Sequence, residues 1–305
     1  MKIAITGAAG FVGRNLVEYL QQRYDNILPI TRTELDLTHA DAVRQYFVNN
    51  KVDIIIHCAA VGGSRKTGYD QHNDGVVDAN TRMFFNLERC LTPEMRMIHI
   101  GSGAEFAREH WHAKMPEEYF DYHVPTDAYG YAKYIISKYI AHCSNITCLR
   151  IFGLFGRYED YRFKFISNAI VKNILQLPIM INQNVVFDYL YIDDFLAIVE
   201  KMLFKNPSFR HYNITPTGSI DLVSIANKIN AVGRFKSEIT VLHEGMNREY
   251  TGDNSRLLAE IGDYSFVGYE EAIERLFSYY SAHLHELDLQ TVQNDPYLQH
   301  CLVKN

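Results

Sequence analysis

The sequence has few cysteines and no arrangement of them that would bind a metal or form a disulfide framework. Five cysteines occur among 305 residues, and none forms a Cys-x-x-Cys pair. Because their number is odd, we expect reduced thiols, as in a cytoplasm. The thirteen histidines are scattered. His110 and His112 flank Trp111, but no further His or Cys completes a ligand set, so no metal site is expected.

The sequence also lacks an excess of positive charge and a long apolar run. The formal net charge is −6 at pH 7, which gives no basic field for nucleic acid. The longest apolar runs, such as residues 52–60, are far shorter than the roughly 20 residues that cross a bilayer. The N-terminus begins with a strand rather than a signal peptide. We therefore expect a cytoplasmic protein that binds neither nucleic acid nor membrane, built as one large domain or two closely packed ones.

A glycine-rich turn near the N-terminus is the first feature that indicates a ligand. The turn lies between a short apolar strand, residues 2–6, and an amphipathic helix that extends to about residue 22. Glycines let the backbone turn tightly and approach a pyrophosphate at the positive end of a helix. Since the GxxGxxG motif follows a strand and opens a helix, it predicts dinucleotide binding. The expected contacts are Gly7, Gly10, Phe11, Val12, Gly13 and Arg14.

The end of the next predicted strand, residues 27–31, bears on which dinucleotide binds. NAD-binding proteins usually keep an acid there for the ribose 2′-hydroxyl. This chain has Arg32 instead, and a guanidinium can pair with the 2′-phosphate of NADP, with Arg14 to assist. The sequence therefore favours NADP over NAD, unless Glu34 turns inward. The other expected cofactor contacts are Asp36, placed for the adenine amino group, and Leu37, Ala59, Ala60 and Asn80.

Tyr129 and Lys133 are the first catalytic candidates. Their spacing places both side chains on one face of a predicted helix. A positive charge beside a phenol favours the phenolate, which helps the phenol to exchange a proton near neutral pH. Such a pair alone is usually a solvated helix face. However, the predicted strand at residues 95–100 leads to Ser102, and ligands bind at the carboxyl ends of strands in α/β sheets. We therefore expect Ser102, the Tyr129 helix and the glycine turn to converge on one crevice.

These motifs together resemble a known family. TGAAGFVG, HCAA, Ser102 and Tyr129-x-x-x-Lys133 are similar to the extended short-chain dehydrogenase/reductases, the NAD(P)-dependent nucleotide-sugar epimerase/dehydratase family. The resemblance extends to about residue 282, and TRTELDL followed by AAVGG is most similar to the GDP-L-fucose synthase-like reductases. It implies a homodimer and an α/β fold, a Rossmann doubly wound parallel sheet with a smaller C-terminal α/β substrate-binding lobe. The NADP-binding domain would span residues 1–160, with contributions from about 185–215, the interleaved lobe residues 161–282, and a C-terminal tail residues 283–305.

The resemblance also implies a Ser–Tyr–Lys catalytic set acting on a nucleotide-sugar substrate. Tyr129 would move the proton on the sugar oxygen, Lys133 would support Tyr129 and hold the nicotinamide ribose, and Ser102 would hydrogen-bond the same oxygen. The expected substrate contacts are Ser102, Gly103, Arg157 and Arg248, with the two arginines placed for the nucleotide diphosphate.

Departures from the family's pattern reduce the number of reactions that the site can be expected to catalyse. Sugar 4,6-dehydratases carry an Asp-Glu pair where this chain has Gly103 and Ala104, and Glu105, one step on, is expected to turn away. The Cys with which GDP-L-fucose synthase epimerises its sugar is also absent, because its place is Ala104, and residues 163–165 lack the His. Tyr129 is then expected to be the only acid/base group in reach of the sugar.

The expected activity is the NADPH-dependent reduction of a nucleotide-activated 4-keto-6-deoxy sugar in surface-glycan precursor synthesis. Two alternatives stay open. The same Ser, Tyr and Lys could serve an NAD(P)-dependent nucleotide-sugar 4-epimerase, which oxidises and re-reduces one carbon, or the chain could be a non-catalytic NADP-binding regulator.

Overall fold

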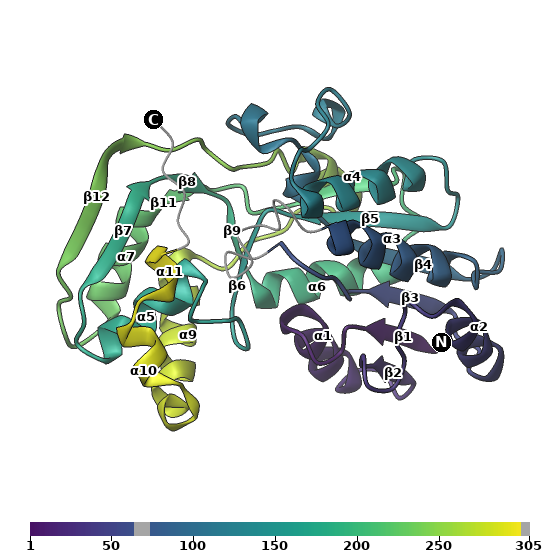
Figure 1. Ribbon diagram of the computed structural model, residues 1–305, viewed down its shortest axis with the longest axis horizontal. Coiled ribbons are helices and arrows are strands. Elements are labelled where there is room, and N and C mark those ends of the chain that lie inside the picture. Colours follow the sequence, from purple (N-terminus) through teal and green to yellow (C-terminus); the bar gives the residue numbers. More distant parts are fainter. Residues whose placement is uncertain (64–73, 300–305) are drawn as a thin grey trace.

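The computed structural model describes residues 1–63 and 74–299, and a parallel sheet of six strands forms its centre (Figure 1). The spatial order of the strands is β10-β5-β4-β3-β1-β2. They are β1 (Ile3–Thr6), β2 (Ile27–Ile30), β3 (Ile54–His57), β4 (Arg96–Ser102), β5 (Ile146–Ile151) and β10 (His211–Ile214). The chain crosses from β1 to β2 on one side and then to β3 on the other, so the carboxyl ends of β1 and β3 mark the switch point where such sheets bind ligands. The predicted doubly wound parallel sheet is confirmed.

Helices cover both faces of this sheet. One layer contains α2 (Ala40–Asn49), α3 (Asp74–Glu88) and α4 (Ala128–Ile140), and the other contains α1 (Phe11–Gln21) and α6 (Ile192–Leu203). Along β1, Ile3 and Ile5 pack on the α1 side while Ala4 packs on the opposite side. Burial on both faces explains why the strands are continuous apolar runs. Among residues 1–63 and 74–299, no helix combines the length and the apolar character that a bilayer crossing demands.

The second half of the chain builds a smaller lobe beside the carboxyl ends of the sheet (Figure 1). Its strands pair two by two, and the longest pair is parallel, β7 (Ile179–Asn184) with β12 (Ile239–Met246). The shorter pairs are β6 (Gly153–Phe155) with β9 (Tyr189–Tyr191), and β8 (Val186–Phe187) with β11 (Ile220–Asp221). Its helices are α5 (Phe165–Ile174), α7 (Leu222–Val232), α8 (Ser255–Ile261) and α9 (Tyr269–Ala282). Because β10 lies in the main sheet although it follows β7 to β9, the two parts are interleaved along the chain.

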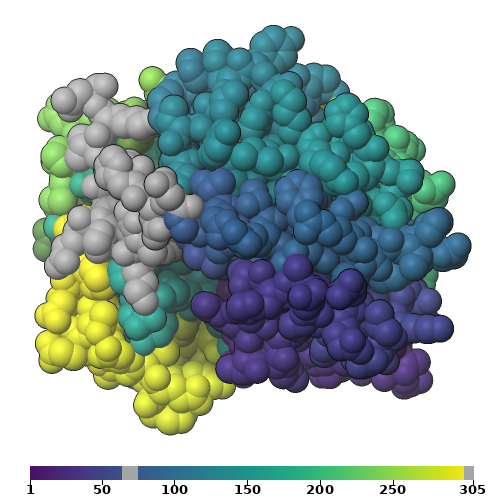
Figure 2. Space-filling view, turned by 45° about the vertical axis from the view of Figure 1, so that its right-hand side comes forward, coloured from purple at the N-terminus to yellow at the C-terminus, as the bar shows by residue number. Residues whose placement is uncertain are grey.

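The C-terminal residues pack onto this lobe as far as the structure describes them. They form α10 (Leu289–Gln293) and α11 (Pro296–Gln299), in yellow at the lower left of Figure 2. Val292 and Tyr297 are buried, and the ring of Tyr297 lies 5.8 Å from that of Phe165. The boundaries expected at residues 160 and 282 remain a prediction, and the expected tail contributes to the core of the lobe up to Tyr297.

The segment between β4 and α4 crosses from the sheet to the lobe. It contains three 3₁₀ turns, Gly103–Glu105, Arg108–His110 and Glu117–Tyr119. Met115 forms a parallel bridge with Gly252, and its amide donates to Thr251 O at 3.0 Å. The segment is therefore tied to the chain around residue 250 and brings those residues to the carboxyl ends of the strands.

Candidate active site

The turn after β1 has the shape of a backbone cradle that only glycine permits. Gly7 has φ +65°, and a Cβ on it would lie 2.8 Å from Ala59 N, at the end of β3. A Cβ on Gly13 would lie 2.2 Å from Gly7 O. Gly10 is the N-cap of α1, and no side chain caps that helix. The first amide groups of α1 therefore face a space without a side chain, which fits the pyrophosphate of a dinucleotide.

Ser102 ends β4 and is held by a buried ion pair. Its amide donates to Glu105 Oε1 at 3.0 Å, and its own Oγ accepts a hydrogen bond from the Ala104 amide at 3.1 Å. Glu105 Oε2 in turn pairs with Arg150 Nε at 2.5 Å, with both side chains buried. Glu105 therefore turns into the core, as expected, and fixes the backbone of Ser102 from behind.

Asp127 positions the helix that carries the Tyr–Lys pair. It is the N-cap of α4, and its Oδ1 accepts a hydrogen bond from the Gly130 amide at 2.9 Å. Its Oδ2 accepts another from Arg108 Nε at 3.1 Å. The cap orients the first turn of α4, where Tyr129 lies. A Cβ on Gly63 would come within 2.6 Å of the Tyr129 ring, so only glycine allows the chain to lie this close to it.

Lys133 lies one turn further along α4 and is almost fully buried. Its Nζ donates to Ile100 O at 2.7 Å and lies 5.9 Å from the centre of the Tyr129 ring. Burial, and then the charge of Lys133, lower the pKa of His57 to about 3. The same two causes hold the pKa of His99 well below its ordinary value. Because these imidazoles are neutral, the lysine ammonium is the positive charge beneath Tyr129.

A cavity of about 490 Å³ joins these groups. The residues predicted from the sequence that line it are Gly7, Gly10, Phe11, Val12, Gly13, Ala60, Ser102, Tyr129 and Lys133. The structure thus brings the glycine turn, the end of β4 and the Tyr129 face of α4 to one place.

Other predicted cofactor residues lie outside the cavity lining. The Asn80 side-chain amide forms hydrogen bonds inside the protein. Its Oδ1 accepts from the Val61 amide, and its Nδ2 donates to the carbonyl oxygens of Val61 and Val76. Arg14 Nε donates to Glu18 Oε1 at 3.2 Å. Leu37 is buried, and the Ala59 amide donates to Thr6 Oγ1 at 3.3 Å.

The edge of β2 presents charges of both signs. Arg32 is 86% exposed, and its Nε lies 4.0 Å from Asp36 Oδ2. Asp36 Oδ1 accepts hydrogen bonds from the Thr38 amide and hydroxyl at 3.0 and 2.7 Å. Glu34 Oε2 accepts from the amide and hydroxyl of Thr31, both at 2.8 Å. An acid and a guanidinium therefore both stand where a cofactor ribose would be recognised.

Three predicted substrate residues also lie away from the cavity lining. Arg157 Nε donates to Asn15 Oδ1 at 2.9 Å, which directs it toward α1. Arg248 is exposed, beyond the end of β12. A Cβ on Gly103 would come within 2.4 Å of the Tyr250 hydroxyl oxygen, so this glycine faces a buried aromatic ring.

Sequence reasoning missed several residues that line the cavity. Aromatic side chains form much of its wall, namely Trp111, Phe152, Phe155, Phe163, Phe165, Phe187, Tyr189 and Tyr250. Besides Lys133, the cations that line it among the described residues are Arg108 and Lys164. Lys164 is the N-cap of α5, a helix without a side-chain cap. No motif marks these residues, although Lys164 directly precedes the amphipathic pattern of α5.

Glu159 is an acidic side chain that also lines the cavity. The sequence led us to expect Tyr129 as the only acid/base group in reach of the sugar, and Glu159 was not considered. It is 5% exposed, and its Oε2 accepts a hydrogen bond from Ser167 Oγ at 2.5 Å. Burial raises the pKa of Glu159 to about 7, against the opposing charge of Lys164. This carboxyl group can therefore change its charge near neutral pH inside the cavity that also contains Tyr129.

Replacing Glu159 by Gln should remove a pH dependence of stability. The folded-state pKa of about 7 lies above the unfolded value, so the folded chain holds more protons between about pH 4.5 and 7, and the free energy of unfolding falls as the pH rises through that range. The variant should be more stable than the wild type above pH 7, by up to about 3 kcal/mol, and equally stable below about pH 4. Thermal unfolding across this range measures the difference, with the exposed Glu274→Gln as control. If the stability of Glu159→Gln and that of the wild type changed with pH in the same way, Glu159 would not have a raised pKa in the folded state.

The comparison of the sequence with known families agrees with this architecture. The profile of the NAD dependent epimerase/dehydratase family matches residues 3–215. This range includes the glycine turn, Ser102, Tyr129, Lys133 and the last strand of the main sheet. The chain belongs to this family.

Its relatives include epimerases and reductases. A GDP-6-deoxy-D-talose 4-dehydrogenase of Aggregatibacter actinomycetemcomitans is 25% identical over 300 residues, 91% of this chain and 97% of the relative. An ADP-L-glycero-D-manno-heptose-6-epimerase of Brachyspira hyodysenteriae is 24% identical over 270 residues, 77% of this chain and 82% of the relative. Among solved structures, a GDP-mannoheptose C4 reductase of Campylobacter jejuni with NADP bound has the same fold, with a TM-score of 0.80 at 18% identity over 92% of this chain and 98% of that one.

The expected closeness to GDP-L-fucose synthase-like reductases has only local support. A GDP-L-fucose synthase of Azorhizobium caulinodans is 40% identical, but over 62 residues, which is 20% of either chain. The likeness thus extends to a fifth of the chain, whereas the family resemblance covers most of it.

Proposed function

We propose that this chain is an NADPH-dependent reductase of a nucleotide-activated 4-keto-6-deoxy sugar. The observation that carries the proposal is the cavity itself, in which Tyr129, Lys133 and Ser102 lie beside the glycine turn. The positions after Ser102 are Gly103 and Ala104, so they offer no carboxylate for a dehydration step. The relatives, which include a 4-dehydrogenase and an epimerase, support a nucleotide sugar as the substrate.

Tyr129, Ser102 and Lys133 have separate roles in the proposed reaction. When bound over the glycine turn, NADPH supplies a hydride for the carbonyl carbon of the sugar. The Tyr129 hydroxyl donates its proton to the sugar oxygen, and Ser102 donates a hydrogen bond to the same oxygen. The Lys133 ammonium, fixed by its bond to Ile100 O at 2.7 Å, stabilises the phenolate that Tyr129 leaves behind. Tyr129 then regains a proton from solvent.

Two cations in the cavity wall suit a nucleotide diphosphate. Lys164 lines the cavity, and the first amides of α5 have no side-chain cap, so both are available to an anion. Arg108 lines the same cavity, held by Asp127. We therefore place the diphosphate near Lys164 and Arg108 rather than near Arg157 and Arg248.

One observation favours the 4-epimerase instead. Glu34 stands at the end of β2 and accepts two hydrogen bonds from Thr31, both at 2.8 Å. An acid at this place suits the ribose 2′-hydroxyl of NAD, and an epimerase returns its hydride to the same sugar and consumes no reduced cofactor.

A substrate panel distinguishes the two. The purified chain is mixed with NADPH and with 4-keto-6-deoxy sugars linked to GDP, dTDP or UDP, and the absorbance of NADPH is followed. We expect oxidation of one NADPH for each sugar reduced and no cofactor retained after purification. Tightly bound NAD, together with interconversion of two sugars without net NADPH use, would establish the epimerase and overturn the proposal.

A further inference from the structure

Tyr250 lies in the wall of the cavity, far in the sequence from every motif of the site. Its side chain is 7% exposed. Trp111 stacks on its ring with centroids 3.8 Å apart and planes 24° apart, and Phe152 lies 5.0 Å away on a tilted plane. The aromatic neighbours leave the ring little freedom, so the direction of its hydroxyl group is fixed.

That hydroxyl group points to the end of β4. Its oxygen lies 2.4 Å from where a Cβ of Gly103 would stand, immediately after Ser102. Burial raises the pKa of Tyr250, and this effect outweighs the nearby charge of Arg108 and a hydrogen bond with the Ser102 side chain, both of which lower it. The phenol therefore keeps its proton and can donate it as a hydrogen bond.

The Ser102 hydroxyl needs such a partner in order to face the substrate. A serine hydroxyl has one hydrogen to donate and two lone pairs that accept. The Ala104 amide fills one lone pair at 3.1 Å. We propose that Tyr250 is a positioning residue that donates its hydroxyl hydrogen to the second lone pair of Ser102 Oγ. The single hydrogen of Ser102 then remains for the sugar oxygen.

The backbone around Tyr250 is anchored from two sides. The Tyr250 amide donates to Val186 O at 3.0 Å. Two residues on, the Gly252 amide donates to Asp188 Oδ2 at 2.8 Å. These bonds join the segment to β8 and to the link between β8 and β9, so Tyr250 cannot withdraw from Ser102 without breaking them.

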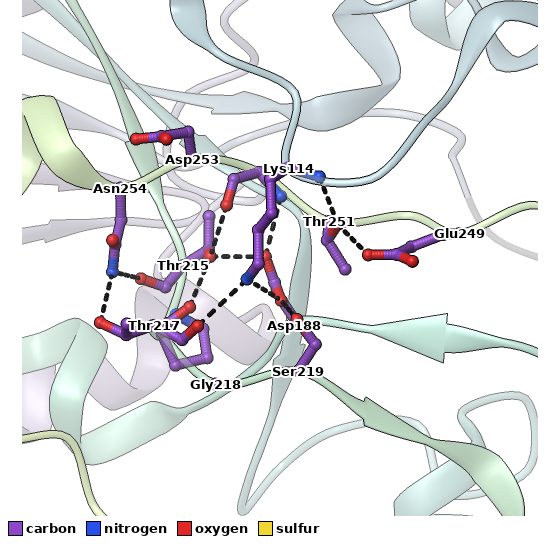
Figure 3. Close-up of polar contacts among 12 residues, drawn as sticks. Lys114, Asp188, Thr215, Thr217, Gly218, Ser219, Glu249, Thr251, Asp253 and Asn254 are labelled. Atoms are coloured by element: carbon purple, nitrogen blue, oxygen red, sulfur yellow. Dashed lines mark hydrogen bonds and ion pairs between the residues drawn. The ribbon is translucent and has the colours of Figure 1, made fainter.

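Asp188 is the centre of the polar cluster that Figure 3 shows. Its carboxylate is fully buried and accepts hydrogen bonds from Lys114 Nζ at 3.0 Å, Thr215 Oγ1 at 2.8 Å and Ser219 Oγ at 2.7 Å, besides the Gly252 amide. Every one of these donors offsets the cost of burying the charge. Because Lys114 belongs to the segment that carries Trp111, the cluster holds both stacked rings in one place.

The kinetic test removes only the Tyr250 hydroxyl group, and it rests on the proposed function. Tyr250→Phe keeps the ring and its stacking, so the melting temperature and the KM for the nucleotide sugar should stay near their wild-type values. We expect kcat to fall about 10-fold, the size of one lost hydrogen bond. Tyr119→Phe, in the same aromatic cluster but with its hydroxyl directed at His110 O, should leave kcat unchanged. A wild-type kcat for Tyr250→Phe would overturn the proposal.

A double variant shows whether Tyr250 acts through Ser102. If it does, Ser102→Ala with Tyr250→Phe should be no slower than Ser102→Ala alone, because the hydroxyl that Tyr250 orients is gone. A general structural effect would multiply the two losses instead, and that result would contradict the proposed role.

A spectroscopic measurement tests the contact without turnover. With 3-fluorotyrosine at position 250, Ser102→Ala should shift the fluorine resonance of the full-length protein, whereas the same label at position 119 should not respond. An unchanged resonance at position 250 would refute the contact. A chain that reduces none of the substrates but shows the shift would refute the proposed function and leave the contact intact.

Discussion

Tyr129→Phe should lower kcat by about 10³-fold, within the range that a positioned general acid contributes. The variant keeps the ring that lies against Gly63 and above Lys133, so the cavity retains its shape. It loses only the hydroxyl hydrogen that the sugar oxygen must receive. NADPH affinity, measured by fluorescence titration, should change less than twofold, because the glycine turn is untouched.

Tyr131 on the same helix supplies the matched control. It is 40% exposed and does not line the cavity. Tyr131→Phe should therefore retain the wild-type kcat. If Tyr129→Phe also retained it, the Ser–Tyr–Lys assignment would be wrong. If both variants lost activity equally, the loss would come from the helix and not from the acid.

Arg150→Met should destabilise the fold strongly, because Arg150 is the cation of a buried ion pair. It leaves the Glu105 carboxylate buried without its cation, and breaking a buried pair costs about 3–5 kcal/mol. Arg150 also lies 4.5 Å from the centre of the Phe120 ring and donates to Ser137 Oγ at 3.0 Å. At about 1.5–2 °C per kcal/mol for a chain of this size, the melting temperature should fall by about 5–10 °C, as scanning calorimetry measures.

Two further variants separate the buried charge from general disruption. Glu105→Gln together with Arg150→Met removes both charges and should recover part of the stability. Arg275→Met breaks two exposed pairs, one with Asp193 at 2.9 Å and one with Glu271 at 2.5 Å, and should cost less than about 1 kcal/mol. An Arg150→Met chain as stable as this surface variant would show that Glu105 does not depend on its partner.

The sequence predicts the first half of the fold well because its signals are local. The strands β1 and β3 are continuous apolar runs. The glycines at which a Cβ would clash with the backbone, Gly7 and Gly13, mark the turn between a strand and a helix. The pairing of β7 with β12 is different. It joins segments about sixty residues apart, and β12 is largely exposed, so no apolar run marks it.

The same contrast holds for the site. Ser102, Tyr129 and Lys133 follow from a strand end and a helical spacing. Tyr250 is one of 21 tyrosines, and only the packing of distant segments brings its hydroxyl group to Gly103, the residue after Ser102. The contacts of charged side chains also depend on the fold, since no pattern in the sequence indicates that Arg157 Nε donates to Asn15 Oδ1.

The transfer of deuterium from the cofactor to the sugar tests the account most directly. The wild-type chain is given the accepted 4-keto-6-deoxy nucleotide sugar and NADPH labelled with deuterium at one face of C4 of the nicotinamide, and the product is examined by mass spectrometry and NMR. Two cofactors are compared, one labelled on each face of C4. We predict that one of them delivers a single deuterium to C4 of the sugar for each NADPH oxidised, and that Tyr129→Phe suppresses this transfer. A product that carries no deuterium from either cofactor, or that forms without oxidation of NADPH, would contradict the assignment of this cavity to ketone reduction.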